Sequence, residues 1–386
     1  MRIKRIEDMK KNIITICMLA LGLAACQNDD TDFSAYTGGT MSTANVIYIF
    51  YNGTTATVSG DENNYVTVNG ADVTINTGAA SDSLLLVLSG STSDGSLLIY
   101  RERKFGIKLA GVSIHNNDGP AINNQCGKSL YVEVVSGTTN TLTDGTSYTE
   151  QTYQQKGALF SEGQIYFSGS GTLNVVGSTQ NAIACDDYIV VDEASITATS
   201  STGHGIKVND GFWMNSGTLT VDVTGDGCKG ISNDSITVIS GGTMAITTSG
   251  DCVYDAEAAD YSSAACIKSD YQFKMTGGMV TLVSSGDGGK GINCDEDVVF
   301  SGGTLTVTTT GGNEDAKPKG VKGDMGIIVS GGLFKVSVNK SWACDNGTDS
   351  DSPADHVTVV GTPTSSTIEK KSVEIIFRCD YNSSGS

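Results

Sequence analysis

Acidic residues recur at fixed intervals in the second half of the 386-residue chain. The segment from Asp226 to Asp234 has an aspartate at each end with glycines and a lysine between, and the segment from Asp287 to Asp295 repeats that spacing. Two further segments follow the same plan, one around an insertion and one with an extra residue. The aspartates that open these segments form the first acidic set, and those that close them form the second: Asp226, Asp251, Asp287 and Asp315, then Asp234, Asp270, Asp295 and Asp324.

Carboxylates beside glycine-rich turns offer the ligands that calcium prefers, which are six to eight oxygen atoms from side chains, backbone carbonyls and water. We therefore expect both acidic sets to bind Ca²⁺. Another interpretation stays open, in which each aspartate is a solvated turn residue that makes local backbone hydrogen bonds. Lys229 and Lys290 lie inside two of the segments and are expected to offset part of the negative charge.

A repeating frame positions both sets. Six units begin with a small residue followed by a β-branched one, and an aspartate or asparagine stands three residues after that branched position. A turn, mostly Gly-Gly, follows at plus ten to eleven. The interval between units varies from about 23 to 36 residues, so one region takes insertions, as in a solenoid. The branched positions are Ile183, Ile206, Ile231, Ile267, Ile292 and Val321.

Apolar residues alternate with polar ones inside each unit, as at Phe273 and Met275 and again at Val280 and Leu282. A period of two is typical of strands with one buried face, and no window has helical spacing. The pattern predicts an all-β parallel β-helix with three strands per coil over residues 45–360, followed by a C-terminal cap or tail over 361–386.

Stacking the coils would bring the acidic sets into two columns, which we expect at one corner of the helix. Neighbouring strands lie about 4.8 Å apart. Two like charges at that distance cost about 3 kcal/mol at an effective dielectric near 20. Such columns need a counter-charge, and bound calcium would provide it.

The net charge of −19 makes nucleic acid a poor partner, since phosphate binding needs clustered basic residues. An apolar run from Ile13 to Ala25, preceded by basic residues, is too short to cross a bilayer and predicts a signal peptide over residues 1–25. Leu23-Ala24-Ala25-Cys26 resembles a bacterial lipobox. We therefore predict lipidation at Cys26, a tether over 26–44, and a monomer anchored by lipid alone to the outer membrane, exposed at the cell surface.

Eight cysteines remain outside the signal and the anchor. An even number in an exported chain permits disulfides. Cys252 and Cys266 flank the insertion from Val253 to Ala265, so a bridge across that loop is the pairing that the sequence suggests.

Before the regular units the chain reads Gly119-Pro120-Ala121-Ile122, then Asn140 to Gly145, Lys156 to Ser161 and Gly169 to Leu173. With the repeats, these segments resemble the bacterial calcium-binding β-helix family of carbohydrate-binding proteins over roughly residues 45–340. The resemblance implies a right-handed parallel β-helix, bound calcium, and binding of cellulose-like or acidic-sugar polymers without demonstrated cleavage. The insertion, and Asn209 in place of a carboxylate, depart from the family pattern.

The expected function is therefore calcium-dependent, non-catalytic binding of a polysaccharide, either an acidic polymer such as polygalacturonate or a cellulose-like glucan. Trp213 lies between two inward residues and should point outward, level with Val190 and Val238, where its ring can pack on a sugar. The complete set of predicted sugar contacts is Trp213, Tyr254, Tyr261, Lys207 and Lys268.

Two other functions stay open. A calcium-dependent polysaccharide lyase of the pectate type needs a base and a cation on the uronate carboxylate, and a lysine of lowered pKa would serve as the base. The candidates are Lys207, Lys268 and Lys322, each directly after the branched position of its unit. A structural surface adhesin that binds a protein would present similar strands, and a glycan-binding test separates it from the other two.

Overall fold

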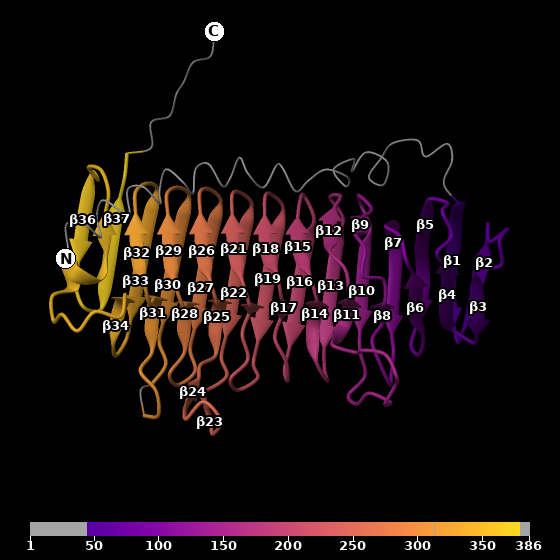
Figure 1. Ribbon diagram of the computed structural model, residues 1–386, viewed down its shortest axis with the longest axis horizontal. Helices are drawn as coiled ribbons and strands as arrows, with labels where there is room; N and C mark the ends of the chain where they lie inside the picture. The colour runs from indigo at the N-terminus through magenta and orange to yellow at the C-terminus, as the bar shows by residue number, and fades with distance from the viewer. Residues whose placement is uncertain (1–44, 313, 379–386) are drawn as a thin grey trace, which may run out of the picture. The chain divides into compact units, whose positions relative to one another are not determined.

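The computed structural model describes residues 45–312 and 314–378. The predicted signal peptide, Cys26 and the tether lie outside the described residues. The described part is a parallel β-solenoid, in which successive coils stack side by side and each coil contributes three strands (Figure 1). The predicted fold class is therefore confirmed. No helix in the described residues is long and apolar enough to cross a membrane.

The three strands of a coil lie on three sides of the solenoid, which are numbered here in chain order. Side 1 is a twelve-stranded sheet made of β3 (Val66–Asn69), β4 (Asp72–Gly78), β6 (Ser96–Arg101), β8 (Ile122–Asn124), β11 (Gly157–Ser161), β14 (Asn181–Cys185), β17 (Ile206–Val208), β20 (Ile231–Asn233), β25 (Ala265–Ser269), β28 (Lys290–Cys294), β31 (Lys319–Gly323) and β34 (Trp342–Asp345).

Sides 2 and 3 belong to one continuous sheet, because the long strand β7 (Phe105–His115) pairs with strands of both sides. Side 2 continues through β9 (Leu130–Val134), β12 (Ile165–Ser168), β15 (Tyr188–Val191), β18 (Gly211–Met214), β21 (Ile236–Ile239), β26 (Gln272–Met275), β29 (Asp297–Phe300), β32 (Gly326–Val329) and β35 (Thr358–Val359). Side 3 continues through β10 (Thr139–Thr143), β13 (Thr172–Gly177), β16 (Ser195–Ser200), β19 (Thr218–Val223), β22 (Thr243–Thr248), β27 (Met279–Ser284), β30 (Thr304–Thr309) and β33 (Leu333–Val338).

Antiparallel strands close both ends of the stack. At the N-terminal end β1 (Asn45–Gly53) pairs with β2 (Thr55–Ser59) on one edge and with β5 (Leu84–Thr92) on the other. At the C-terminal end β37 (Ser372–Ile376) runs antiparallel to β33 and to β36 (Ser365–Ile368), after a short 3-10 helix at Pro353–His356. Such caps cover strand edges that would otherwise pair with other chains.

The repeating frame of the sequence is the register of the structure. The branched positions from Ile183 to Val321 pair in one continuous line along side 1, and all are buried. From β15 to β32 the alternating apolar residues of sides 2 and 3 point inward and are at most 1% exposed, apart from one coil in which Thr237 replaces an apolar residue. Thr237 is also buried, and its hydroxyl group lies 2.7 Å from that of Ser269.

Close packing explains the glycines of the frame. The second glycine of each Gly-Gly corner has a positive φ, for example +80° at Gly278 and +84° at Gly303, a region that other residues rarely adopt. The glycine before the branched position faces its own coil instead. A Cβ at Gly291 would lie 2.1 Å from the Cγ1 of Val307, and one at Gly230 would lie 2.3 Å from the Cγ2 of Ile246.

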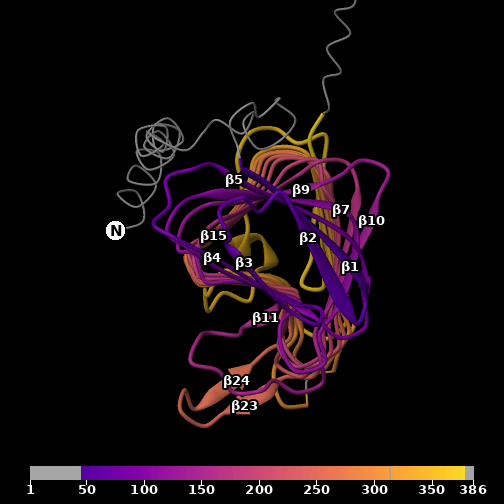
Figure 2. The same ribbon diagram turned by 90° about the vertical axis from the view of Figure 1, so that its right-hand side faces the viewer.

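The insertion at Val253 to Ala265 folds as a β-hairpin of β23 (Val253–Asp255) and β24 (Asp260–Ser262). The hairpin projects from the solenoid at the entry to side 1 (Figure 2). Cys252 and Cys266 form no disulfide across the hairpin. Cys252 is partly exposed, whereas Cys266 is fully buried and donates a hydrogen bond to the carbonyl of Val283. The bridge suggested by the sequence is therefore wrong, and the cysteines of the described residues are free thiols.

Candidate functional site

An aromatic ladder crosses four coils on the outer face of side 2. It consists of Tyr131, Tyr166, Tyr188 and Trp213, of which Tyr131 is buried and the other three are partly exposed. The rings of Tyr131 and Tyr166 are stacked at 5.0 Å and 18°. Tyr188 meets Tyr166 edge-on at 5.7 Å and meets Trp213 edge-on at 5.5 Å. With coils about 4.8 Å apart, the ladder extends about 14 Å along the solenoid axis.

Trp213 forms the C-terminal end of this ladder and lies where the sequence places it. Its neighbours in register are Val190 and Val238, and the side chain is partly exposed between two buried neighbours. The indole lies over Gly211, where a Cβ would come within 2.3 Å of the ring. Gly211 therefore makes room for the tryptophan. Tyr131 and Tyr166 were missed because the sequence frame began after them, and Tyr188 because it stands two positions earlier in its unit than Trp213 does.

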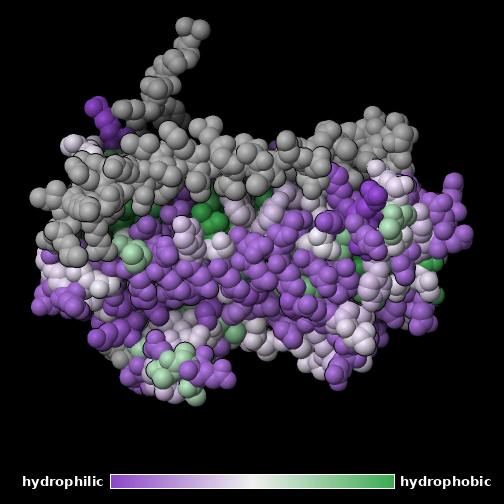
Figure 3. All heavy atoms as spheres, viewed as in Figure 1, coloured by the Kyte–Doolittle hydropathy of each residue, from purple (hydrophilic) through white to green (hydrophobic). Residues whose placement is uncertain are grey.

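The hairpin brings its two predicted tyrosines together. Tyr254 and Tyr261 lie opposite each other in the strand pair, with ring centroids 5.2 Å apart. Tyr254 is 54% exposed, and the Tyr261 hydroxyl lies 3.5 Å from a carboxylate oxygen of Asp315. Figure 3 shows an apolar area where this hairpin projects, below a largely hydrophilic face. The hairpin is thus a second aromatic surface, several coils from most of the ladder.

The first acidic set forms a ladder of hydrogen bonds between coils. The carboxylate of Asp226 accepts the backbone N–H of Asp251 at 2.9 Å, and Asp251 accepts that of Asp287 at 2.7 Å. Asp287 in turn accepts the N–H groups of Glu314 and Asp315, both at 3.1 Å. These carboxylates therefore connect each coil to the next. The sequence left open that the aspartates bond to backbone N–H groups, and in the structure they do so between coils.

The first acidic set still has the donor atoms for a hard cation. Ligand atoms of Cys252, Asp287 and Asp315 lie within 4.8 Å of one another. Each carboxylate that accepts one N–H keeps further lone pairs, and adjacent glycine carbonyls are oxygen donors of the kind that calcium uses. Burial, together with Asp287 and Asp315, raises the pKa of the Cys252 thiol. The residues present around Asp287 fit a calcium ion with oxygen ligands, with the thiol as a bystander.

The second acidic set has a different environment. It follows the short strands of side 1, whereas the first set precedes them, so the two sets run up two corners and the expectation of one shared corner is wrong. Lys207 forms an ion pair with Asp234, and Lys322 forms one with Asp324 at 2.7 Å. Lys268 lies 2.6 Å from Asp270 and 2.7 Å from Asp295. Three lysines thus pair with the four carboxylates, and their ammonium groups take the place that a metal cation would need.

Lys268 shows the strength of this pairing. Burial works against its charge, but hydrogen bonds to Asp270 and Asp295 raise its pKa overall. A lysine held in its charged form cannot act as a base near neutral pH. Lys207 and Lys268, predicted as sugar contacts, thus hold the second acidic set together in the structure.

Lys229 and Lys290 do not offset the acidic sets as the sequence suggested. The Nζ of Lys229 donates to the carbonyl of Gly227 at 2.6 Å and to the hydroxyl of Ser262 at 2.7 Å. The Nζ of Lys290 donates to the hydroxyl of Ser263. Neither lysine forms an ion pair with another described residue.

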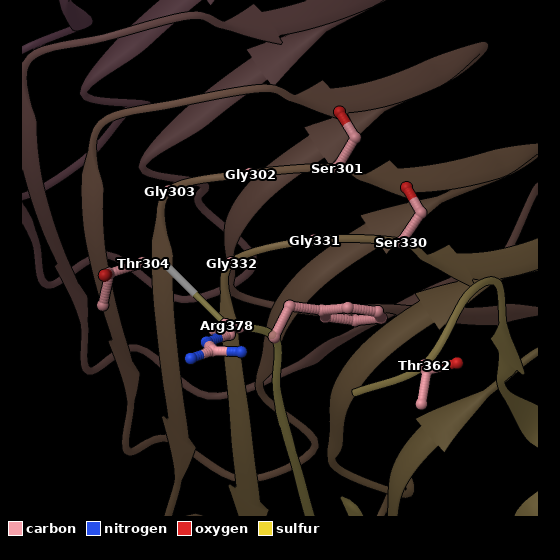
Figure 4. Close-up of a pocket in the computed structure, with 10 residues that line it drawn as sticks. Ser301, Gly302, Gly303, Thr304, Ser330, Gly331, Gly332, Thr362 and Arg378 are labelled. Carbon is pink, nitrogen blue, oxygen red and sulfur yellow. The ribbon is translucent and has the colours of Figure 1, made fainter. Parts of the chain in front are cut away.

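A shallow depression of about 600 Å³ lies near the C-terminal end of the stack. Two Gly-Gly corners and the segment near Phe377 line it, and Figure 4 shows the hydroxyls of Ser301 and Ser330 on successive coils with Arg378 near Gly332. None of the predicted site residues lines this depression, so the ladder and the acidic sets remain the candidate site.

Residues 69–353 match a family model described as carbohydrate-binding domain-containing protein. The chain belongs to this family. No curated protein matches it. A solved structure titled as the polysaccharide lyase-like protein from C. thermocellum, gadolinium derivative, is similar to it, with 21% identity and a TM-score of 0.53. That similarity covers 70% of this chain and 99% of the other, and it supports the fold alone. Binding of polysaccharide in general follows from the family.

Proposed function

We propose that this carbohydrate-binding domain protein holds a polysaccharide chain along side 2, without cleaving it, and that calcium at the first acidic set assists. The aromatic ladder is the observation that carries the proposal. Aromatic faces pack on the apolar faces of sugar rings, and the three partly exposed rings on successive coils, Tyr166, Tyr188 and Trp213, fit an extended polymer better than a single sugar. An acidic polymer such as polygalacturonate or a cellulose-like glucan would suit this arrangement.

Calcium has two roles in this proposal. Held by Asp287 and Asp315 at the entry to side 1, the ion would reduce repulsion along the first acidic set, and it would attract carboxylates of an acidic polymer at that corner, beside the hairpin and away from the ladder on side 2. The carboxylates of the first acidic set would supply oxygen ligands, and their hydrogen bonds between coils hold these ligands in place. The second acidic set plays no part in metal binding, because lysines already pair with its carboxylates.

The location of the protein is part of the proposal. A lipid on Cys26 would hold the solenoid at the outer membrane and leave its sides free to meet a polymer outside the cell. The monomer and the lipid anchor both rest on the sequence.

Tryptophan fluorescence and calorimetry test the role of the ladder. Cello-oligosaccharide and oligogalacturonate should each change the emission of Trp213, and by calorimetry Trp213→Ala should weaken binding about tenfold, as expected for a lost aromatic contact. Trp342→Phe is the matched control, because Trp342 stacks on His356 at 4.2 Å at the end of the stack. Unchanged affinity in Trp213→Ala would exclude the ladder as the binding surface.

A lyase is the second candidate, and one observation favours it. Burial, followed by the positive charge of Lys322, lowers the pKa of Lys290 to about 8, in the range of a general base. Growth of ultraviolet absorbance from an unsaturated product, lost in Lys290→Met, would establish the lyase. Binding without such a product supports the non-catalytic function.

A further inference from the structure

Lysines gather on and beside side 1 in a chain whose net charge is −19: some directly follow the branched position, and Lys229, Lys290 and Lys319 stand two residues before it, where the chain enters the side. Six lysines lie on five of its coils: Lys207, Lys229, Lys268, Lys290, Lys319 and Lys322. Those that follow the branched position alternate with polar residues, since Lys207 pairs in register with Ser232, and Lys268 with Asn293. We call this group the lysine face.

Four members of the lysine face already have counter-ions. Lys207, Lys268 and Lys322 pair with the second acidic set, and Lys319 pairs with Asp345. The two that remain, Lys229 and Lys290, each stand two residues before the branched position of their coils. Lys229, like Lys290, is only partly exposed, and neither has a carboxylate within ion-pair distance among the described residues.

Leaving two partly buried ammonium groups without counter-ions is costly, because burial penalises the charged form. Burial lowers the pKa of Lys229 and that of Lys290, and neighbouring lysines add to the effect, while Asp270 near Lys229 and Asp260 near Lys290 offset only part of it. An ammonium group has three donors. Lys229 uses two and Lys290 uses one, so donors remain for an incoming acceptor.

The hairpin positions these two lysines. Ser262 ends its return strand and Ser263 follows it, and their hydroxyls accept hydrogen bonds from Lys229 and Lys290 respectively. The coil between the two lysines carries Ala265 in the equivalent position, in register with Lys290. The lysines are therefore two coils apart, about 10 Å, with a small residue between them. Only this coil has the hairpin, so the arrangement occurs once among the described coils.

We propose that Lys229 and Lys290, held by the hairpin serines, form a binding subsite for the anionic group of an acidic sugar residue. The carboxylate would act as the ion-pair partner that the described residues do not provide, and the exposed Tyr254 at the same hairpin offers a ring for the sugar. This subsite rests on the proposed polysaccharide binding and would select acidic polymers over neutral ones. A sulfate on a sugar has the same chemistry and would be accepted by the same donors.

Calorimetry of the full-length protein with two probes tests the subsite. Oligogalacturonate supplies the carboxylates, and cello-oligosaccharide of the same length is the neutral comparison. Lys229→Met with Lys290→Met should weaken oligogalacturonate binding about tenfold or more, as for a lost charged hydrogen bond. Binding of the neutral probe should not change. Lys340→Met with Lys371→Met removes the same charge from exposed positions and should leave both affinities unchanged.

The outcomes separate this inference from the function on which it rests. If the wild type binds neither probe, the proposed function fails. If it binds both but the paired methionine variant keeps wild-type affinity for oligogalacturonate, the subsite is wrong and the function stands. A sulfated glucan that binds like oligogalacturonate, and is lost in the same variant, supports the subsite for anions in general.

A fold control keeps the result interpretable. Removing two partly buried charges should not lower the urea midpoint, because the ammonium groups are destabilising where they lie. Lys229→Arg with Lys290→Arg retains the charge and should keep a measurable preference for the acidic probe. Loss of that preference in the arginine pair, with the fold intact, would contradict a role in anion recognition.

Discussion

The hydrogen-bond ladder of the first acidic set predicts a difference between two substitutions at Asp287. Alanine and asparagine both remove the charge, and hence the same repulsion from Asp251 and Asp315. Asparagine keeps an oxygen that can accept one of the N–H groups of residues 314 and 315, which now lie 3.1 Å from the carboxylate. One such bond contributes about 0.5–1.5 kcal/mol. The free energy of unfolding of Asp287→Ala in urea should therefore be about 1 kcal/mol lower than that of Asp287→Asn.

Asp295 provides the matched control for this comparison. It belongs to the second acidic set, forms an ion pair with Lys268, and accepts no backbone N–H from the described residues. Its alanine and asparagine variants should have equal free energies of unfolding within experimental error. Equal stability of the two Asp287 variants, or the same gap at both positions, would refute the ladder.

Calcium extends the same experiment. A ligand present at about 100 times its Kd stabilises the folded state by about 2.7 kcal/mol. Calcium should raise the urea midpoint of the wild type and of the Asp295 variants, and a chelator should reverse the effect. Both Asp287 variants should lose most of this stabilisation. If calcium still stabilises the Asp287 variants but no longer stabilises the Asp295 variants, the ion binds at the second acidic set and the proposal is contradicted.

Three more predictions concern packing, acid stability and anchoring. Gly291→Ala should cost about 1–3 kcal/mol in urea unfolding, because its Cβ would meet Val307 at 2.1 Å, whereas Gly127→Ala, with open space around it, should be near neutral. His204 accepts the N–H of Lys229, and burial lowers its pKa to about 4. The unfolded chain then binds a proton first, so stability should fall as pH drops from about 6.5 towards 4, and His204→Asn should flatten that slope. Cys26→Ala should release the protein from the membrane fraction, and retention there would exclude the lipid anchor.

The repeat predicted the fold because each coil buries the same positions. The branched residues from Ile183 to Val321 are in exact register, and the varying interval between them is taken up by loops and by the hairpin. Backbone pairing and apolar burial involve only each coil and its neighbours, so the repeat in the sequence is enough to predict them. Trp213 was placed correctly for the same reason.

The site could be predicted only in part, because pairing across coils depends on side-chain reach. The sequence put both acidic sets at one corner, but the short strand of side 1 separates them. It also paired the carboxylates with Lys229 and Lys290, whereas Lys207 and Lys268 reach them. Residues far apart in sequence set these contacts, and no spacing rule within one unit distinguishes among them.

Isothermal titration of the purified protein with oligogalacturonate and cello-oligosaccharide, with calcium and then with chelator, tests the central claim most directly. The account predicts heat of binding that weakens when calcium is removed, with no unsaturated product in the ultraviolet. Growing absorbance would make the protein a lyase. No heat with either polymer would contradict carbohydrate binding by this solenoid and leave the protein-binding adhesin as its function.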